Sequence, residues 1–495
     1  MNHPSPDEFA RLAKPGALVP VYREILADIE TPVTAYMKIA KGQEHSFLLE
    51  SVERADTIGQ YSFLGANPSI VFRSKGRDVT IVRNGEETSF ESDHPLDELK
   101  KLMAQYTPFQ VEGLPEFHGG AVGYVSYDQV RFFERLPDEN PDTLELPDLY
   151  FMITDTLLIF DHVNNRLKIV SNAHVQGEPM AAYHEAVCKI DDLERALKSP
   201  LVVKSERLHA GQIDTEPRSS FTRDGFCEAV SRAKEYITAG DVFQVVLSQR
   251  FERDVYASPL NIYRALRCIN PSPYMTLVQF PGFSLVGSSP EVMTQVRGKR
   301  CMVRPIAGTR PRGATSDEDV ALEKDLMADE KEIAEHILLV DLGRNDIGRI
   351  SEPGTVAPVP SRLMYIERYS HVMHIVSEVE GEMKEGEDAY SALKATFPMG
   401  TVSGAPKIRA MEIIDELEPV RRGPYAGGCG YISFSGDMDT CIVIRTMIIK
   451  DGVAYVQAGA GIVYDSVPER EFEETVNKAK ALLRAVDFAE RGLES

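Results

Sequence analysis

Tryptophan is absent from the 495 residues of this chain, and cysteine is sparse. The six cysteines lie far apart and form no Cys-x-x-Cys pair, which argues against a disulfide framework or a thiolate zinc site. This usage favours a reducing compartment, the cytoplasm. No run of about 18 apolar residues predicts a membrane-spanning helix, and the first residues lack the basic and apolar segments of a secretion signal.

Basic residues are also scarce relative to acidic ones. Lys and Arg number 54 against 76 Asp and Glu, which gives a formal net charge of −22. Nucleic acids and anionic membranes require a basic surface, so neither is an expected partner. The apolar fraction of 43% and the charged fraction of 26% are typical of a folded globular protein.

Short alternating strands dominate residues 19–170, with Gly, Pro, Asn and Asp between them. We predict strands at 34–40, 46–52, 69–74, 78–84, 120–128 and 151–161. A helix is predicted at 181–196, and the charged, Pro- and Gly-containing segment 198–220 is predicted to be a linker. These features divide the chain into an N-terminal mostly-β subdomain, 19–197, and a second subdomain, 221–490. The sequence leaves open whether the first is independent or one edge of a continuous sandwich.

Helices and strands both occur in the second half. Thr222 is a candidate N-cap of a helix that ends at Gly240. The segment TSDE, from Thr315, is typical of a capping box at the start of a long helix that reaches about Val340. Runs of strands interrupted by a few helices, without regular βαβ alternation, predict an α+β fold with mainly antiparallel sheets.

Two predicted helices carry glutamates three residues apart, Glu332 with Glu335 and Glu471 with Glu474. Each pair shares a helix face. If the two faces were opposed across a cavity, they would offer oxygen ligands to Mg²⁺, which takes one or two carboxylates and leaves positions for water and substrate. Spacing alone favours the alternative of two solvated faces.

Glycines and one histidine mark further candidate positions. The Gly-rich segment 398–407 precedes a helix, so its N–H groups could hold an anion, although an ordinary turn explains it equally well. Gly459 and Gly461 interrupt a predicted strand, where either close approach of a ligand or a bulge would account for them. His374 lies on an apolar strand, where a histidine is more often a core residue than a general base.

Seven segments in a fixed order make a more specific pattern: PSPYM, GSSPE, RPIAGTRPRG, DEKEIAEHILLVDLGRND, GTVSGAPK, GCGYISF and AGAGIVYDSVPEREFEET. With them the chain resembles the anthranilate synthase component I branch of the chorismate-utilising enzyme family over nearly its whole length. The resemblance implies an α/β sandwich of two packed antiparallel sheets flanked by helices. It also implies Mg²⁺-dependent amination of chorismate at C2, then pyruvate elimination to give anthranilate, the first committed step of tryptophan biosynthesis.

The resemblance assigns roles to individual residues. Metal binding is implied for Glu335 and Glu474, with Glu332 and Glu471 in support. Catalytic roles are implied for Glu291, the general acid for loss of the C4 hydroxyl, and for His374 and Thr401, which serve removal of the C2 proton and expulsion of pyruvate. Substrate binding is implied for Tyr425, Arg445, Gly459, Ala460 and Gly461.

Two positions separate reactions within the family. Isochorismate and salicylate synthases carry a Lys at the position of Gln244 as the base for water; because Gln cannot deprotonate water, ammonia is favoured here. Aminodeoxychorismate synthases usually carry a Lys in place of Ala307, which forms a covalent substrate adduct. Both positions favour anthranilate as the product. The alternatives are an aminodeoxychorismate synthase subunit and a catalytically inactive relative that senses chorismate or tryptophan.

The resemblance also implies a partner and a regulator. No amidotransferase segment is recognised in the sequence, so ammonia is expected from a glutamine amidotransferase subunit, anthranilate synthase component II, in an α2β2 heterotetramer. Feedback inhibition by tryptophan is expected at a pocket formed by Glu50, Ser51, Pro273, Tyr274, Met275 and Cys441. There Glu50 would hold the ligand's ammonium and Ser51 would hydrogen-bond nearby. A strand end packed on a turn is the structural alternative.

Overall fold

The computed structural model describes residues 1–51, 59–201, 216–369 and 372–493. These residues form a sheet of 14 strands, a sheet of 11 strands and a small sheet of three, and nearly all neighbouring strands are antiparallel. The predicted α+β class is confirmed. None of the described helices is long and apolar enough to cross a membrane.

The 14-stranded sheet combines strands from the whole chain. Its order is β1 (Asn2–His3), β2 (Ala17–Leu26), β12 (Arg166–His174), β11 (Thr156–Asp161), β4 (Tyr61–Ala66), β3 (Ser46–Glu50), β15 (Tyr274–Phe280), β16 (Phe283–Ser289), β27 (Thr446–Lys450), β28 (Val453–Ile462), β14 (Gln244–Asp254) and β13 (Arg218–Ser219). Two short strands lie off this path: β8 (Thr107–Pro108) pairs with β2, and β24 (Gly404–Ala405) pairs with β14.

The other sheets are equally mixed. The 11-stranded sheet has the order β20 (Ala357–Pro358), β23 (Val379–Glu382), β18 (Arg300–Val303), β17 (Val292–Arg297), β26 (Met438–Ile442), β25 (Gly428–Ser433), β9 (Gly120–Val125), β10 (Leu149–Thr154), β5 (Ile70–Lys75), β6 (Asp78–Arg83) and β7 (Glu86–Glu91). The small sheet has the order β19 (Ile306–Pro311), β22 (Val372–Val376) and β21 (Tyr365–Arg368).

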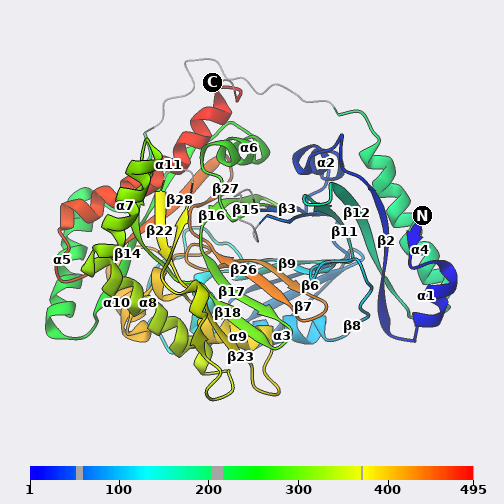
Figure 1. Cartoon of the computed structure of the whole chain (residues 1–495), viewed down its shortest axis with the longest axis horizontal. Coiled ribbons are helices and arrows are strands. Elements are labelled where there is room, and N and C mark those ends of the chain that lie inside the picture. The colour runs from blue at the N-terminus through cyan, green and yellow to red at the C-terminus, as the bar shows by residue number, and fades with distance from the viewer. Residues whose placement is uncertain (52–58, 202–215, 370–371, 494–495) are drawn as a thin grey trace.

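Both large sheets run across the predicted subdomain boundary. Strand β3 pairs with β15 in one sheet, and β9 pairs with β25 in the other. In Figure 1 the N-terminal strands β2, β11 and β12 lie on one side of the molecule, and β14, β28 and their helices lie on the other. Residues 19–197 and 221–490 therefore form the two sides of one continuous sandwich. Of the predicted linker, residues 202–215 lie outside the described part of the chain.

Apolar side chains of the two large sheets meet in an interior cluster that includes Phe47, Val122 and Ile448. Helices cover the outer faces. On the 14-stranded sheet these are α1 (Pro6–Leu12), α2 (Pro32–Ile39), α4 (Pro179–Leu197), α6 (Pro259–Ile269) and α11 (Pro468–Glu490), with α5 (Arg223–Ala239) and α10 (Lys407–Leu417) at the β14 end. On the 11-stranded sheet they are α3 (Pro95–Met103), α8 (Glu330–Gly348) and α9 (Ala389–Thr396), and α7 (Ser316–Ala328) lies beside β19.

Three predictions of local structure are wrong. The strand predicted at 151–161 is two strands, β10 and β11, which belong to different sheets. Residues 34–40, predicted as a strand, lie mostly in helix α2, because the Thr31 side chain caps the helix and Pro32 favours its first turn. The long helix predicted from Thr315 to Val340 is two helices, since Asp329 ends α7 and caps α8 by accepting hydrogen bonds from two N–H groups of that helix. The predicted N-caps Thr222 and Thr315 are confirmed.

Candidate active site

Two glycines of β28 form the floor of the site. Gly459 lies opposite Ser248 of β14, and Gly461 lies opposite Val246. A Cβ atom on Gly459 would lie 2.8 Å from Tyr425 Oη, and one on Gly461 would lie 2.7 Å from Gln244 Nε2. The pairing of β14 with β28 shows no register shift, so close approach of side chains, not a bulge, explains these glycines.

Ala460, between the two glycines, has a different role from its neighbours. Its side chain is fully buried in the apolar cluster that β14 and β28 form with α5 and α10. Successive side chains of a strand point to opposite faces. Ala460 can therefore contribute only backbone groups to the site.

Glu291, between β16 and β17, supplies a carboxyl group. Burial raises its pKa, while Thr401, Lys478 and Arg445 act in the opposite direction by favouring the ionised form. A carboxyl group whose pKa is raised holds its proton at higher pH, as a general acid requires. Thr401 lies in the short 3₁₀ helix η3 (Gly400–Val402).

Arg445 and Tyr425 lie close enough to Glu291 for the charges of all three to interact. Burial lowers the pKa of Arg445, and Glu291 and Tyr425 oppose this effect. Burial raises the pKa of Tyr425 to about 12, so the phenol is neutral near pH 7 and can donate a hydrogen bond. A guanidinium beside a phenol is a donor pair suited to a carboxylate ligand.

His374 lies on β22, as the sequence predicted. Its Nδ1 lies 3.0 Å from the carbonyl oxygen of Gly308 and 3.0 Å from Thr309 Oγ1. A carbonyl oxygen only accepts, so this contact favours the tautomer with a proton on Nδ1 and leaves Nε2 to act as a base. Burial lowers the pKa of His374, which keeps the ring neutral near pH 7. The nearby His371 lies outside the described residues.

The predicted acidic pairs lie on two helices, α8 and α11, and the charge of Glu474 on α11 reaches Glu335 on α8. Gln244 Nε2 donates to Glu335 Oε1 at 3.4 Å. Burial raises the pKa of Glu335, and the charges of Glu332 on the same helix and Glu474 on α11 raise it further. Burial likewise raises the pKa of Glu471, with a contribution from Glu474. The carboxylates of α8 and α11 are thus near enough to repel one another.

Cationic side chains already contact two of these carboxylates. Arg310 Nη1 lies 3.5 Å from Glu332, and Lys478 Nζ lies 2.6 Å from Glu474. In the described part of the chain no three His, Cys, Asp or Glu side chains converge as a ready metal site. The donor set still fits Mg²⁺, because this ion needs only one or two protein carboxylates and would relieve their repulsion.

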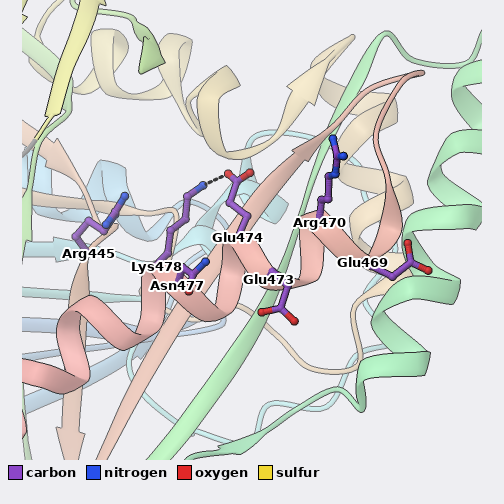
Figure 2. A pocket seen from close by; sticks show the side chains of 7 residues that line it. All are labelled: Arg445, Glu469, Arg470, Glu473, Glu474, Asn477 and Lys478. Carbon is purple, nitrogen blue, oxygen red and sulfur yellow. Dashed lines mark ion pairs between the residues drawn. The ribbon is translucent and has the colours of Figure 1, made fainter. Parts of the chain in front are cut away.

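A cavity of about 580 Å³ opens beside Arg445, Glu474 and Lys478. Its lining consists of Arg445, Glu469, Arg470, Glu473, Glu474, Asn477 and Lys478. In Figure 2 the side chains of Glu474 and Lys478 extend to one side of α11, and Glu473 points to the opposite side. The volume of this cavity is typical of a site that binds a small molecule.

Sequence reasoning did not identify Lys478 as part of the site. Its Nζ pairs with Glu474 and donates to the carbonyl oxygen of Gly459 at 2.8 Å, so it joins α11 to the glycine strand. The four-residue spacing from Glu474 was the available signal.

The residues predicted to bind tryptophan lie on or beside both faces of the 14-stranded sheet, except Cys441, which lies in β26 of the 11-stranded sheet. Tyr274 Oη donates to Asp439 at 2.7 Å, and Tyr274 and Cys441 belong to the cluster between the sheets. Met275 instead belongs to the cluster under the helices, on the same face as its strand neighbour Glu50. Pro273 is buried just before β15. The Ser51 hydroxyl is buried, with no hydrogen-bond partner among the described residues.

The Glu50 carboxylate is already occupied within the chain. It accepts hydrogen bonds from Tyr263, from Arg267 Nε at 3.2 Å and from Ser62 Oγ at 3.4 Å. Glu50 is only 5% exposed. These hydrogen bonds within the chain compensate the burial of the carboxylate. The role predicted for Glu50 in binding tryptophan stays a prediction.

The chain matches known proteins over almost its full length. The model of the chorismate binding enzyme family matches residues 44–484. Anthranilate synthase component 1 of Acetivibrio thermocellus is 48% identical over 99% of both chains, and that of Aquifex aeolicus is 47% identical over 99% of this chain and 98% of its own. The crystal structure of anthranilate synthase component I from Streptococcus pneumoniae aligns with a TM-score of 0.76 at 38% identity, covering 92% of this chain and 98% of the other. The chain therefore belongs to the chorismate binding enzyme family, in its anthranilate synthase component 1 branch.

Proposed function

We propose that this chain is the aminase subunit of an anthranilate synthase in tryptophan biosynthesis. It binds chorismate with Mg²⁺, adds ammonia at C2 and eliminates pyruvate to give anthranilate. One observation carries the proposal: Glu291 interacts with Thr401, Tyr425, Arg445 and Lys478, all from distant parts of the sequence. Two of these residues, Arg445 and Lys478, line the cavity.

Substrate binding rests on Arg445 and Tyr425. Chorismate carries two carboxylates, and an acidic chain needs local donors to hold either of them. The Arg445 guanidinium and the neutral Tyr425 phenol bind one carboxylate, which lies against the backbone of Gly459 and Gly461, where only hydrogen atoms replace side chains.

Glu291 and His374 carry the proton transfers. Glu291, whose pKa is raised by burial, donates a proton as the C4 hydroxyl leaves. His374 Nε2 removes the C2 proton, since Nδ1 is directed at the Gly308 carbonyl and the ring is neutral. Thr401 assists this second step beside Glu291. Gln244 cannot deprotonate water, so ammonia is the nucleophile.

The second carboxylate of chorismate needs a cation. Glu335 and Glu474, with Glu332 and Glu471 in support, would hold Mg²⁺, which neutralises both these carboxylates and that of the substrate. Glu474 of α11 contributes to the raised pKa of Glu335 of α8, which supports this assignment. Ala307, which is buried on β19 and pairs with Ile375, lacks the amine that directs amination to C4.

The remaining assignments follow from the branch to which the chain belongs. The name component 1 implies a second component, which we propose is a glutamine amidotransferase that supplies ammonia in an α2β2 assembly in the cytoplasm, while the chain alone can still use free ammonia. Tryptophan would inhibit at a pocket formed by Glu50, Ser51, Pro273, Tyr274, Met275 and Cys441, favouring a state with a less competent site. The absence of tryptophan from the chain would let it be made when tryptophan is short.

The test is to incubate the purified chain with chorismate, Mg²⁺ and ammonium at alkaline pH and to identify the products by chromatography and mass. Anthranilate plus pyruvate, lost with EDTA and reduced by tryptophan, is the expected result. Aminodeoxychorismate would indicate the C4 amination reaction instead. Isochorismate would contradict the role of Gln244, and chorismate binding without turnover would favour a sensor.

A further inference from the structure

A buried ion pair lies behind the candidate active site. Arg422 and Glu418 each have a side chain that is 2% exposed. Arg422 Nε and Nη2 donate to the two oxygens of Glu418 at 2.9 and 2.6 Å. A buried pair of this kind offsets its desolvation only through good geometry and further hydrogen bonds.

Those further hydrogen bonds reach two walls of the site. Arg422 Nη1 donates to the carbonyl oxygen of Val402 at 2.7 Å, next to Thr401 in η3. Arg422 Nη2 donates to the carbonyl oxygen of Val246 at 2.7 Å, in the β14 residue opposite Gly461.

Glu418 completes the connection to β14. Its Oε1 accepts hydrogen bonds from the N–H of Ser248 at 2.7 Å and from Ser248 Oγ at 2.8 Å. Ser248 lies opposite Gly459. The pair therefore contacts β14 at the two residues that face the two glycines of the site.

The guanidinium of Arg422 also lies against two tyrosine rings. Its Cζ lies 4.8 Å from the ring centroid of Tyr127 and 5.6 Å from that of Tyr425. A desolvated cation near an aromatic ring is attracted to it. This contact fixes the ring whose hydroxyl lies against Gly459.

We propose that Arg422 and Glu418 are a positioning pair that holds Thr401, β14 and the Tyr425 ring in the arrangement the reaction needs. Neither residue lines the cavity of Figure 2, so the pair acts through the groups it holds. The inference rests on the proposed function, because it takes Tyr425 and Thr401 as working parts of the site.

The test replaces the pair by apolar residues of similar size, Arg422→Met with Glu418→Leu. Such replacement of a buried ion pair is often neutral for stability. Here the Val402 and Val246 carbonyls and the Ser248 N–H group also lose their partners, so we expect a folded chain with a lowered Tm. We expect kcat with ammonia to fall about 100-fold and KM for chorismate to rise, because misplacement by about 1 Å costs a factor of this size. Chorismate affinity measured by calorimetry without ammonia reports binding apart from turnover.

The matched control lies at the other end of β14. Arg253 and Glu490 form a second buried pair, with Nη2 to Oε2 at 3.0 Å and side-chain exposures of 7% and 1%. Arg253→Met with Glu490→Leu should leave kcat and KM within about twofold, because this pair touches no part of the site.

Parent-like kcat and KM in a folded Arg422→Met, Glu418→Leu chain would overturn the proposal. If that chain does not fold, Arg422→Lys decides: it keeps the charge, but a single ammonium cannot hold Glu418 and both carbonyls. A loss of kcat of about tenfold at retained Tm supports the positioning role, and an unchanged kcat overturns it. Absence of anthranilate from the parent chain would instead contradict the proposed function itself.

Discussion

Glu291 and Glu50 are both buried carboxylates with an arginine nearby, but the groups that surround each carboxylate differ. Glu50 accepts hydrogen bonds from Tyr263, Arg267 and Ser62, so hydrogen bonds within the chain compensate its burial. Glu291 has Arg445 and Lys478 near it, but burial still raises its pKa. The comparison teaches that a compensated carboxylate holds strands and helices together, whereas an incompletely compensated one marks a place for chemistry.

The largest effect is expected when Glu291 is made unable to donate a proton. Glu291→Gln should lower kcat by about 10²- to 10⁴-fold, the contribution of a positioned general acid. Because the pKa of Glu291 is raised, the parent kcat should fall as pH rises through that pKa, and the variant should lack this limb. Glu228→Gln, at an exposed position of α5 outside the cavity lining, is the control and should behave as the parent. A fully active Glu291→Gln chain would contradict the comparison.

His374 tests the catalytic half of the comparison, because it is the proposed base for the C2 proton. His374→Gln should lower kcat by about 100-fold through loss of the base. Burial lowers the pKa of His374, so the parent should lose activity only as pH falls below about 6.5, where the ring becomes protonated. Rates are compared at a constant concentration of free ammonia. An acid limb well above pH 6.5 would show that another group is the base.

Arg445 tests substrate binding. Arg445→Lys keeps the charge but loses the planar donor fork, so KM for chorismate should rise about tenfold with a smaller change in kcat. Arg470→Lys changes an exposed arginine of the same cavity and is the matched control. Equal changes in KM for the two variants would mean that the planar donor fork of Arg445 gives no advantage in chorismate binding over a positive charge alone.

Glu50 tests the structural half of the comparison, the claim that a compensated buried carboxylate stabilises the fold. Glu50→Gln removes the charge that Arg267 and Tyr263 share, and the free energy of unfolding should fall by about 1–2 kcal/mol. Chemical denaturation of parent and variant gives this difference. No loss of stability would show that the hydrogen bonds to Glu50 do not compensate its burial.

Ser51 has the smallest expected effect on the fold and the most selective effect on regulation. Ser51→Phe fills the space beside a buried hydroxyl that has no partner among the described residues. Calorimetry should show that tryptophan binding is lost. Unaltered tryptophan binding would exclude this region as the regulatory site.

Local patterns in the sequence predicted much of this molecule, and long-range pairing was the main part they could not supply. The β22 strand, the helices that carry the acidic pairs and the two cap residues follow from alternation, spacing and side-chain chemistry. The prediction failed at residues 34–40, where a capping threonine and a proline override the strand pattern.

The continuity of the sheets and the compensation of buried charges depend on residues far apart in the chain. No local signal pairs β3 with β15 or brings Arg267 to Glu50. The same limit hid the Arg422–Glu418 pair, whose spacing is helical but whose burial depends on β14 and η3. Residue roles carried by the family resemblance were therefore easier to predict than the contacts that support them.

The most direct measurement is a crystal structure of the chain with chorismate and Mg²⁺ in the absence of ammonia. The account predicts chorismate beside Gly459 and Gly461, with one carboxylate on Arg445 and Tyr425 and the metal between Glu335 and Glu474. Chorismate bound elsewhere, or bound with Glu291 and His374 remote from its ring, would contradict it.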